Sequence, residues 1–355
     1  MKKLSVHSVV SNRNYSVLFV KDIKKEIEKI ARERPTHCLM DRQIFKIYKN
    51  ILDRKDFKSL KLIKVDEDQK TLEKINEYIS FLLKNNIHKD HAILVIGGGL
   101  VQDIGSFTSH IILRGIDWIF IPTTLLAISD SCIGSKSGIN IDKYKNQVGS
   151  FHPPTKIIMS TAFLDSLPKT GVIDGIGEIL KHALIKGGKR YQFISENISK
   201  FGVDKRVDER IIYESLLIKK EVVEKDELEK NIRRLLNYGH TFGHALEGYT
   251  DHKISHGIGV LTGMDLANYI SLREKIMSRS NFNKIHNLIY SFIKSRMVKI
   301  IDFDKYMIFL SRDKKVVGDR VNVLLAKGPG EVKIMKFKLD IKLKNYIKEY
   351  FDKYA

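Results

Sequence analysis

The stretch Ala92-Ile-Leu-Val-Ile-Gly-Gly-Gly-Leu-Val-Gln-Asp103 decides the fold class. Its first five residues are apolar and predict a buried strand, and the three glycines that follow lead into a predicted helix. A glycine-rich turn at this place lets a phosphate group approach the backbone N–H groups at the start of the helix. A tight strand-to-helix turn explains the same glycines equally well, and Gln102 stands where a dinucleotide-binding motif has its last glycine.

The same alternation extends to both sides of this stretch. Short apolar runs predict buried strands at residues 15–20, 38–40, 60–65, 118–121 and 156–159. Leu72, Ile75, Ile79 and Leu82 recur at helical spacing, so residues 70–84 are expected to form an amphipathic helix. Alternating strands and helices indicate an α/β domain with a Rossmann-like parallel sheet that is covered by helices.

The pattern changes near residue 160. Helices are predicted over residues 175–185, 211–223, 232–248, 257–273 and 282–295, and residues 321–325 are the strongest late candidate for a strand. We therefore expect an α/β domain over residues 1–160 and an all-α domain over residues 161–355. No low-complexity linker lies between them, so we expect a packed cleft at the boundary rather than a flexible tether.

Bulk composition limits the class of protein. The chain has 355 residues, with 43% hydrophobic and 29% charged side chains, which is ordinary for a globular protein. Its longest apolar runs, at 118–121 and 125–128, are too short to span a bilayer, and the N-terminus lacks a signal-peptide core. We expect a cytoplasmic protein without a membrane partner, in which Cys38 and Cys132 are free thiols.

The net charge of +20 has three possible explanations. Nucleic-acid binding would need a recognisable motif or a basic stripe interleaved with aromatic residues, and the sequence shows neither, so we expect no nucleic-acid partner. Attraction of an anionic substrate explains a small cluster of the charge. Compositional drift towards lysine, visible over residues 333–353, explains most of it.

A segment dense in hydroxyl groups follows the strand predicted at 118–121. It reads Pro122-Thr-Thr-Leu-Leu-Ala-Ile-Ser-Asp-Ser-Cys-Ile-Gly-Ser-Lys-Ser-Gly138 and contains Asp130 and Lys136; Lys145 and Asn146 follow shortly. A solvated loop would explain the polarity. It would not explain small hydroxyl side chains alternating with apolar residues directly after a buried strand, so we predict that this segment lines a site.

The segment Arg233-Arg-Leu-Leu-Asn-Tyr-Gly-His-Thr-Phe-Gly-His-Ala-Leu-Glu247 is predicted to be helical. His240 and His244 are four residues apart, so both imidazoles lie on one face, and His256 follows after a short turn. Gly239 and Gly243 cost roughly 1 kcal/mol each inside a helix, which indicates that something approaches the backbone closely. We interpret this as a metal or an anionic substrate, although a His-x-x-x-His pair also arises by chance.

A catalytic metal usually keeps three protein ligands, so a carboxylate is also needed. Glu178 and Lys181 lie three residues apart in a predicted helix with apolar neighbours. One interpretation is a surface ion pair worth only tenths of a kcal/mol; the other makes Glu178 the ligand and Lys181 a substrate contact. Lys219 and Arg233 flank the histidine segment and could complete a pocket for an anion.

Together these segments resemble the sugar phosphate cyclase family, and most of all its 3-dehydroquinate synthase branch. The resemblance covers residues 65–330 and rests on GGGLVQD, RGIDWIFIPTTLLAISDSCIGSKSGIN, YKNQVGSF, GIGEILK, KDELEKNIRRLLNYGHTFGHALE and SHG, in this order. It implies an N-terminal NAD-binding domain, a C-terminal helical metal-binding domain and a site in the cleft between them.

The resemblance also implies roles for individual residues. The metal ligands, for zinc or else cobalt, fall on Glu178, His240 and His256. Contacts to the nicotinamide cofactor fall on Glu67, Lys70, Gly99, Leu100, Val101, Gln102, Asp103, Thr123, Thr124, Lys136, Lys145, Phe163 and Ser166. Positions that act on the substrate fall on Asp130, Lys136, Asn146, Lys181, Lys219, Arg233, Asn237, His244 and either Lys314 or Lys315. Arg114 matches an arginine that reaches the site of a neighbouring subunit, which implies a homodimer.

The implied chemistry takes place on one bound sugar phosphate. An alcohol is oxidised by NAD+, phosphate is eliminated, the ketone is reduced again, the ring opens and an intramolecular aldol step forms a carbocycle. The first choice of substrate is 3-deoxy-arabino-heptulosonate 7-phosphate, giving 3-dehydroquinate. A cyclase acting on another sugar phosphate, or a metal- and NAD-dependent polyol dehydrogenase, are the alternatives.

Four residues depart from the usual pattern of the 3-dehydroquinate synthase branch. Gln102 and Ser135 replace glycines, Lys220 replaces an alanine, and Ile258 replaces the glutamate expected after His-Gly. That glutamate would lie beside His256, where groups behind the ligands tune a metal, so its loss could change the metal or the substrate. Arg233 and Asn237, in contrast, keep the identities expected for 3-dehydroquinate synthases.

Overall fold

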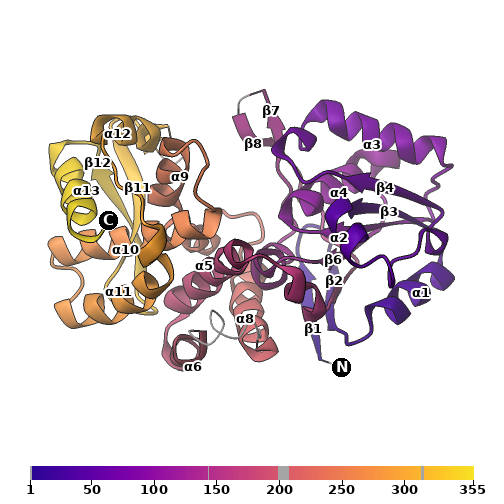
Figure 1. The fold of residues 1–355 in the computed structure, drawn as a ribbon, viewed down its shortest axis with the longest axis horizontal. Helices are drawn as coiled ribbons and strands as arrows, with labels where there is room; N and C mark the ends of the chain where they lie inside the picture. The colour runs from indigo at the N-terminus through magenta and orange to yellow at the C-terminus, as the bar shows by residue number, and fades with distance from the viewer. Residues whose placement is uncertain (1, 143, 199–207, 313–315) are drawn as a thin grey trace. The chain divides into compact units, whose positions relative to one another are not determined.

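A computed structural model describes residues 2–142, 144–198, 208–312 and 316–355. The chain forms two compact units (Figure 1). The first unit comprises Met1–Leu167 together with Lys219–Leu228, and the second comprises Pro168–Ile218 together with Glu229–Ala355. The boundary lies at Leu167, and the return of residues 219–228 to the first unit is a feature that the predicted boundary near residue 160 does not include.

The first unit is built on a seven-stranded sheet, which confirms the α/β prediction. Its strands are β1 (Lys3–Ser8), β2 (Arg13–Phe19), β3 (Thr36–Asp41), β4 (Ser59–Ile63), β5 (Ala92–Gly97), β6 (Trp118–Pro122) and β9 (Lys156–Met159). They lie in the order β1-β2-β9-β6-β5-β3-β4, and every neighbouring pair is parallel except β1 with β2. Residues of β3, β5 and β6 are buried throughout, as expected for strands covered on both faces.

Helices cover this sheet (Figure 1). They are α1 (Ile23–Glu33), α2 (Arg42–Ile47), α3 (Leu72–Lys84) and α4 (Gly99–Ile111). Side chains of Asp22, Asp41 and Thr71 accept hydrogen bonds from the first turns of α1, α2 and α3, so each of these helices begins at a polar cap. Helix α1 was not predicted from the sequence, because charged residues separate the few apolar residues of its buried face.

The carboxyl ends of the parallel strands carry the loops of interest. The chain leaves β3 towards β4 on one side and leaves β5 through α4 towards β6 on the other, so β3 and β5 meet at a topological switch point, where α/β sheets bind ligands. Four short elements lie along this edge or near it: η2 (Glu67–Gln69), a π-helical turn (Ala127–Ser131), and a two-stranded ribbon of β7 (Ile139–Ile141) and β8 (Tyr144–Val148).

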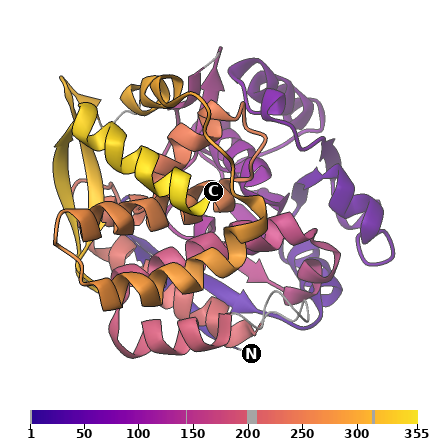
Figure 2. The same cartoon turned by 60° about the vertical axis from the view of Figure 1, so that its left-hand side comes forward.

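The second unit is mainly helical, as predicted (Figure 2). Its helices are α5 (Lys169–Lys186), α6 (Gly188–Ile198), α8 (Glu209–Lys225, whose end belongs to the first unit), η6 (Ile232–Asn237), α9 (His240–Tyr249), α10 (His256–Arg273), α11 (Arg279–Ile293), α12 (Phe303–Ser311) and α13 (Ile341–Tyr354). The central helix is α10, which is buried from Gly257 to Ser271 and contacts α5, α9, α11 and α13.

A buried polar group anchors α10. Asp265 is fully buried, and its Oδ2 accepts hydrogen bonds from His286 Nδ1 on α11 and Tyr350 Oη on α13, both at 2.8 Å. Removing one partner of such a buried network leaves the other unsatisfied, at a cost of about 1–3 kcal/mol. The C-terminal helix is therefore fixed to the helix that begins at His256.

A small antiparallel sheet corrects the prediction of an all-α second domain. It consists of β10 (Val316–Val317), β11 (Arg320–Ala326) and β12 (Val332–Lys338), in that order. Only the region of β11 was a strand candidate, because its inward residues are apolar and buried. Most residues of β12 are exposed, including Lys333, Lys336 and Lys338, and the alternation of polar and apolar residues in its sequence is broken at Ile334 and Met335.

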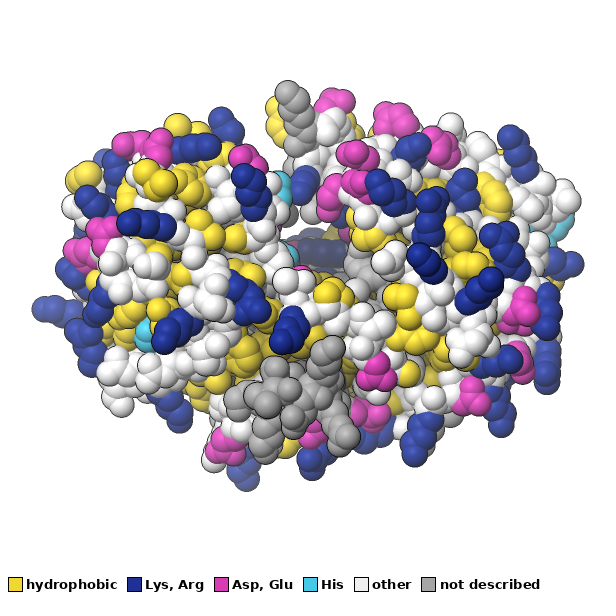
Figure 3. All heavy atoms as spheres, in the orientation of Figure 1, with side chains coloured by type: hydrophobic (Ala, Val, Ile, Leu, Met, Phe, Trp, Pro, Cys, Tyr) yellow, Lys and Arg dark blue, Asp and Glu magenta, His cyan; other side chains and the backbone are white. Residues whose placement is uncertain are grey.

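Two further expectations concern the whole chain. Cys38 and Cys132 are free and buried, as predicted. In the part of the chain that the structure describes, no helix has the length and apolar character needed to cross a bilayer. Lysine and arginine side chains are spread over the face shown in Figure 3, with acidic side chains among them, which agrees with compositional drift as the main source of the charge.

His37 forms a buried polar contact at the amino-terminal end of β3. Its Nδ1 lies 2.8 Å from Ser59 Oγ and its Nε2 lies 3.0 Å from His91 Nδ1. Burial lowers the pKa of His37 to about 4, and the nearby charges of His91, Lys58 and His88 act in the same direction.

This shift predicts how stability depends on pH. Between pH 6.5 and 4 the unfolded chain binds a proton at His37 and the folded chain does not, so stability is complete above pH 6.5 and declines as the pH falls. We expect His37→Asn to remove at most about 3 kcal/mol of this decline, as measured by urea unfolding at pH 7 and pH 4. His7→Asn, at an exposed histidine, is the control; equal pH dependence in wild type and His37→Asn would contradict the assignment.

Candidate functional site

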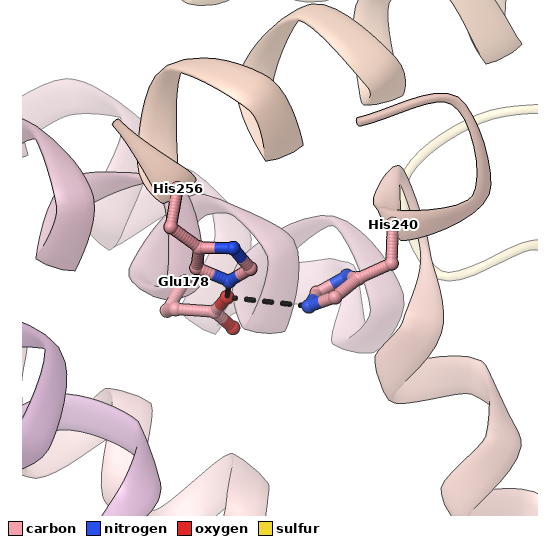
Figure 4. A group of neighbouring side chains, drawn as sticks. All are labelled: Glu178, His240 and His256. Atoms are coloured by element: carbon pink, nitrogen blue, oxygen red, sulfur yellow. Dashed lines mark hydrogen bonds and ion pairs between the residues drawn. The ribbon is translucent and has the colours of Figure 1, made fainter. Parts of the chain in front are cut away.

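Three side chains of the second unit converge on one point (Figure 4). Glu178 lies within α5, whereas His240 and His256 are the first residues of α9 and α10. Glu178 Oε1 is 3.3 Å from His256 Nε2 and 3.5 Å from His240 Nε2. Their potential ligand atoms all lie within 4.8 Å of one another. Two imidazoles and one carboxylate are a donor set that fits a catalytic zinc or a similar divalent metal, with room for a fourth ligand.

The remaining polar atoms of these side chains have partners that hold them in place. Lys181 Nζ contacts Glu178 Oε2, which leaves Oε1 directed at the two histidines. His240 Nδ1 lies 3.3 Å from the carbonyl oxygen of Tyr238, and His256 Nδ1 lies 3.0 Å from Glu247 Oε1. In both histidines Nδ1 is therefore engaged by the protein, and Nε2 is the nitrogen that faces the carboxylate.

The two histidines differ in their electrostatic environment. Burial holds the pKa of His240 well below its ordinary value; Glu178 opposes this shift, and Lys181, His244 and His256 add to it. Burial also lowers the pKa of His256, but its hydrogen bonds to Glu178 and Glu247 prevail and raise it to about 10. Without a metal, a proton places positive charge on His256 alone. A divalent cation bound by both Nε2 atoms would place positive charge beside His240 as well.

Glycines bring the three helices close enough for this geometry. A Cβ on Gly243 would lie 2.7 Å from Gly259 O, and one on Gly263 would lie 2.0 Å from Gly239 O, so α9 and α10 contact each other through bare backbone. A Cβ on Gly177 would lie 3.1 Å from the Cα of Gly257, which joins α5 to α10 in the same way. Helix surfaces made of glycine carry no side chains, so the helix backbones can approach one another.

This contact corrects the interpretation of Gly239 and Gly243. The group that approaches them is the backbone of α10, not a metal or a substrate. The predicted helix over residues 232–248 is also wrong in its continuity. Gly239 has φ of 82°, a left-handed conformation, and separates the 3₁₀ helix η6 from α9, which begins at His240.

His244 is one turn further along α9 and is exposed. Its ring centre lies 5.3 Å from that of His240 and 6.0 Å from that of His256. It also forms a second group of possible ligands with Glu247 and His256. We assign the metal to the group of Glu178, His240 and His256, in which Glu178 is buried and both histidines direct Nε2 at it, whereas Glu247 engages His256 Nδ1.

In the first unit, the predicted cofactor residues gather at the carboxyl edge of the sheet. Lys70 is buried, and its Nζ lies 2.6 Å from Asp103 Oδ2. Asp103 Oδ1 accepts a hydrogen bond from the backbone N–H of Gly138. Burial raises the pKa of Asp103 despite the opposing effect of Lys70. The ion pair fixes the loop after β4 against the start of α4.

The turn after β5 has the features of a site for a phosphate group. Gly98 precedes α4 and has no side chain that could occupy the N–H groups of the first helical turn. A Cβ on Gly99 would meet only Ser131 Oγ, at 3.8 Å. Thr123 is buried, and its Oγ1 has no hydrogen-bond partner among the described residues. A dinucleotide fits both observations, because it offers a pyrophosphate and several hydroxyl groups.

Asn140 connects two groups of predicted residues, although it was not itself predicted to be a site residue. Its Nδ2 donates to Glu67 Oε2 at 2.7 Å, and its Oδ1 accepts from the backbone N–H of Asn146 at 2.9 Å. Its own N–H donates to the carbonyl of Lys70. The ribbon that carries Lys145 and Asn146 is thereby joined to the loop that carries Glu67 and Lys70, although both ribbon residues are themselves exposed.

The hydroxyl-rich segment contacts the part of α8 that belongs to the first unit. Lys219 Nζ lies 2.7 Å from Asp130 Oδ1 and donates to the carbonyl of Asp130 at 2.6 Å. Ser135 Oγ contacts Glu227, which is buried and also accepts from Ser8 Oγ and the N–H of Val10. The structure thus brings together Asp130 and Lys219, two residues 89 positions apart, as predicted site members.

The remaining predicted residues have the following environments. Arg114 is exposed at the end of η3 (Ile112–Arg114), and Phe163 is buried in the hydrophobic core. Ser166 Oγ accepts a hydrogen bond from Tyr48 Oη. Asn237 Nδ2 donates to Glu229 Oε1 at 2.6 Å, and Arg233 is buried. The positions of Lys314 and Lys315 lie outside the described residues.

The four departures each have a defined environment. Gln102 and Ser131 exchange two hydrogen bonds, so Gln102 ties α4 to the π-helical turn. Ser135 has φ of 64°, and its hydroxyl contact with Glu227 offsets the strain of that left-handed backbone. Lys220 pairs with Glu224 at 2.8 Å, and Ile258 is buried.

Comparison with known proteins agrees with this architecture. The fold resembles a 2-deoxy-scyllo-inosose synthase solved with carbaglucose-6-phosphate, NAD+ and Co2+ (22% identity, 98% of this chain and 99% of that chain, TM-score 0.87). It also resembles a 2-epi-5-epi-valiolone synthase from Streptomyces hygroscopicus with NAD+ and Zn2+ bound (19% identity, 97% and 98% of the two chains, TM-score 0.84). These structures share the fold of this chain.

Sequence relatives identify the family. Profiles described as 3-dehydroquinate synthase N-terminal and C-terminal match residues 61–174 and 175–316. A 3-dehydroquinate synthase from Pelagibacter ubique is 35% identical over 92% of this chain and 93% of its own, and one from Helicobacter pylori is 35% identical over 77% and 78%. The chain belongs to the 3-dehydroquinate synthase family.

The glycine contacts predict that metal binding can be lost without changing a ligand. We expect Gly243→Ala to push α9 away from α10, to destabilise the second unit by about 1–3 kcal/mol and to weaken metal binding. Asn283→Ala is the control, because Asn283 is an exposed residue of α11 in the same unit. Metal content after dialysis and the melting temperature are the measurements, and a Gly243→Ala protein with normal metal content would refute the expectation.

Proposed function

We propose that the protein is a 3-dehydroquinate synthase, which converts 3-deoxy-arabino-heptulosonate 7-phosphate into 3-dehydroquinate and phosphate. The observation that carries this proposal is the convergence of Glu178, His240 and His256. The relatives named 3-dehydroquinate synthase are similar to this chain over most of its length. The metal is proposed to be zinc or cobalt and the cofactor NAD, the groups bound in the similar structures.

Each unit is proposed to have its own role. The first unit, with the glycine turn, Lys70, Asp103 and Thr123, binds NAD, whose nicotinamide supplies the reversible hydride transfer that no side chain can supply. The second unit holds the metal, which would act as a Lewis acid on the alcohol to be oxidised. The buried Lys181 contacts Glu178 and keeps one carboxylate oxygen turned towards the histidines.

Substrate binding is proposed to use cationic side chains that are already held in place. Lys219 is buried against Asp130, and Lys136 Nζ lies 5.9 Å from the centre of the Phe151 ring. Arg233 is proposed to bind the substrate carboxylate, because a guanidinium can hold a carboxylate through two hydrogen bonds. His244 is exposed beside the metal ligands and is proposed to exchange a proton near the substrate phosphate.

Two alternatives remain open to the same experiment. The burial of Ile258 where the family usually has glutamate favours a cyclase that acts on a different sugar phosphate. Similarity to a glycerol dehydrogenase from Schizosaccharomyces pombe (14% identity, TM-score 0.61) favours a polyol dehydrogenase. A dehydrogenase, however, gives no reason for the cluster of Lys136, Lys145, Asn146 and Arg233.

We also propose a cytoplasmic homodimer. The support is the match of Arg114 to an arginine that serves a neighbouring subunit in the family, together with the exposure of Arg114 at a left-handed turn. Sedimentation or light scattering of the purified protein measures the oligomeric state directly.

The reaction itself provides the first test of the function. Purified protein with NAD+ and Zn2+ or Co2+ should release inorganic phosphate from 3-deoxy-arabino-heptulosonate 7-phosphate, and chelation of the metal should stop the release. Glucose 6-phosphate and sedoheptulose 7-phosphate are parallel substrates. Release from one of these alone would assign the protein to another cyclase activity, and alcohol oxidation without phosphate release would assign it to the dehydrogenases.

Arg233 provides a test of how the substrate is bound. A charge-assisted hydrogen-bonded pair contributes about 1.5–3 kcal/mol, so Arg233→Ala should raise KM about 10- to 100-fold for the carboxylated substrate. Arg234→Ala is a matched control, since Arg234 is adjacent in sequence and exposed. An unchanged KM in Arg233→Ala would show that this guanidinium does not bind the carboxylate.

A further inference from the structure

We propose that Glu247 is the positioning residue of the metal centre: its carboxylate holds the ring of His256 so that Nε2 faces Glu178 and His240. This inference rests on the proposed function, because it concerns how the metal site is prepared. Glu247 was absent from the residues predicted from the sequence. Ile258 replaces the glutamate that the family usually has beside His256, and Glu247 provides a carboxylate there from a different part of the chain.

The geometry around His256 carries the proposal. Its two ring nitrogens lie on different sides of the imidazole, with Nδ1 at 3.0 Å from Glu247 Oε1 and Nε2 at 3.3 Å from Glu178 Oε1. When Nδ1 donates its hydrogen to Glu247, the lone pair on Nε2 is left for a metal. A carboxylate behind a ligating histidine fixes the ring orientation and makes the free nitrogen more basic.

The fold holds Glu247 for this contact. Glu247 lies seven residues after His240 on α9, so the two side chains share one face of the helix two turns apart. Its side chain is only 14% exposed. The opposing residue of α10 is Gly259, where a Cβ would lie 2.9 Å from Glu247 Oε1. A larger residue at 259 would occupy the space that the carboxylate needs in order to reach His256.

Charge is the second effect of Glu247. Around the two histidines lie the carboxylates of Glu178, Glu247 and Asp174, the last of which accepts a hydrogen bond from the N–H of Gly257 at 2.8 Å. Lys181 is the cation in direct contact with Glu178. The position after Gly257, Ile258, is 5% exposed and apolar and adds no charge. Glu247 thus supplies negative charge that favours a divalent cation at the ligands.

Two substitutions separate orientation from charge. Glu247→Gln keeps an oxygen that can accept the hydrogen bond from Nδ1 but removes the charge, whereas Glu247→Ala removes both. We expect Glu247→Ala to bind Zn2+ and Co2+ about 10- to 100-fold more weakly than wild type. We expect Glu247→Gln to recover most of that loss. Glu331→Ala is the control, because Glu331 is an exposed carboxylate of the same unit.

Affinity is measured by competition with a chromophoric chelator, without substrate or NAD, and the Co2+ visible spectrum reports the ligand geometry. In Glu247→Ala the Co2+ spectrum should change in shape, because the His256 ring is no longer fixed. Melting temperatures in EDTA show whether each variant folds without metal. If Glu247→Ala does not fold, Glu247→Asp replaces it, since its carboxylate is one methylene too short to keep the contact.

The outcomes distinguish this inference from the proposed function. Wild-type protein that binds no divalent metal, or that keeps its metal in His256→Ala, would refute the proposed metal centre itself. Normal affinity and an unchanged Co2+ spectrum in a folded Glu247→Ala or Glu247→Asp protein would overturn only the role of Glu247. A Glu247→Gln protein as weak as Glu247→Ala would overturn the positioning role, because charge alone would then explain the effect.

Discussion

The close approach of helix backbones at glycine is the constraint on which the metal-binding geometry depends. Each of the three candidate ligands has a glycine as its chain neighbour: Gly177 precedes Glu178, Gly239 precedes His240, and Gly257 follows His256. Each of these glycines lies where a Cβ would clash with another helix. The positions of the ligands thus depend on neighbouring residues that have no side chain. His240 and His256 lie at helix N-termini because α9 and α10 begin where their backbones contact another helix.

The two units differ in how their buried charged side chains are paired. In the first unit, buried cations are paired with carboxylates, Lys70 with Asp103 and Lys219 with Asp130. Such pairs hold a long side chain in one position before any ligand arrives, although burial makes them costly. In the second unit, carboxylates outnumber cations around His240 and His256, which leaves a local excess of negative charge. The first arrangement suits an anionic ligand that competes for a fixed cation, and the second suits a metal ion.

Much of this architecture could be predicted from the sequence. The apolar run before Gly97 and the periodicity of Leu72 to Leu82 predicted the α/β unit, because buried strands and amphipathic helices leave clear patterns. The ligand set came from the family resemblance, and the structure brings its three members together. The reason for Gly239 and Gly243 could not be predicted, since the residues of α10 that approach them are 16 to 25 positions away in sequence. Asn140, Glu227 and Glu247 were missed for the same reason: each acts through a contact distant in sequence.

The lysines of β12 have a consequence for the behaviour of the whole molecule. This strand ends its sheet, and on its outer side it pairs with no strand among the described residues, while Ile334 and Met335 are exposed on it. An open edge with apolar side chains can join the edge of another molecule and begin aggregation. Lys333, Lys336 and Lys338 place like charges along that edge, so two copies repel each other there. Part of the positive charge that looked like drift therefore acts as protection against self-association, and polyanions or lysine acetylation would weaken it.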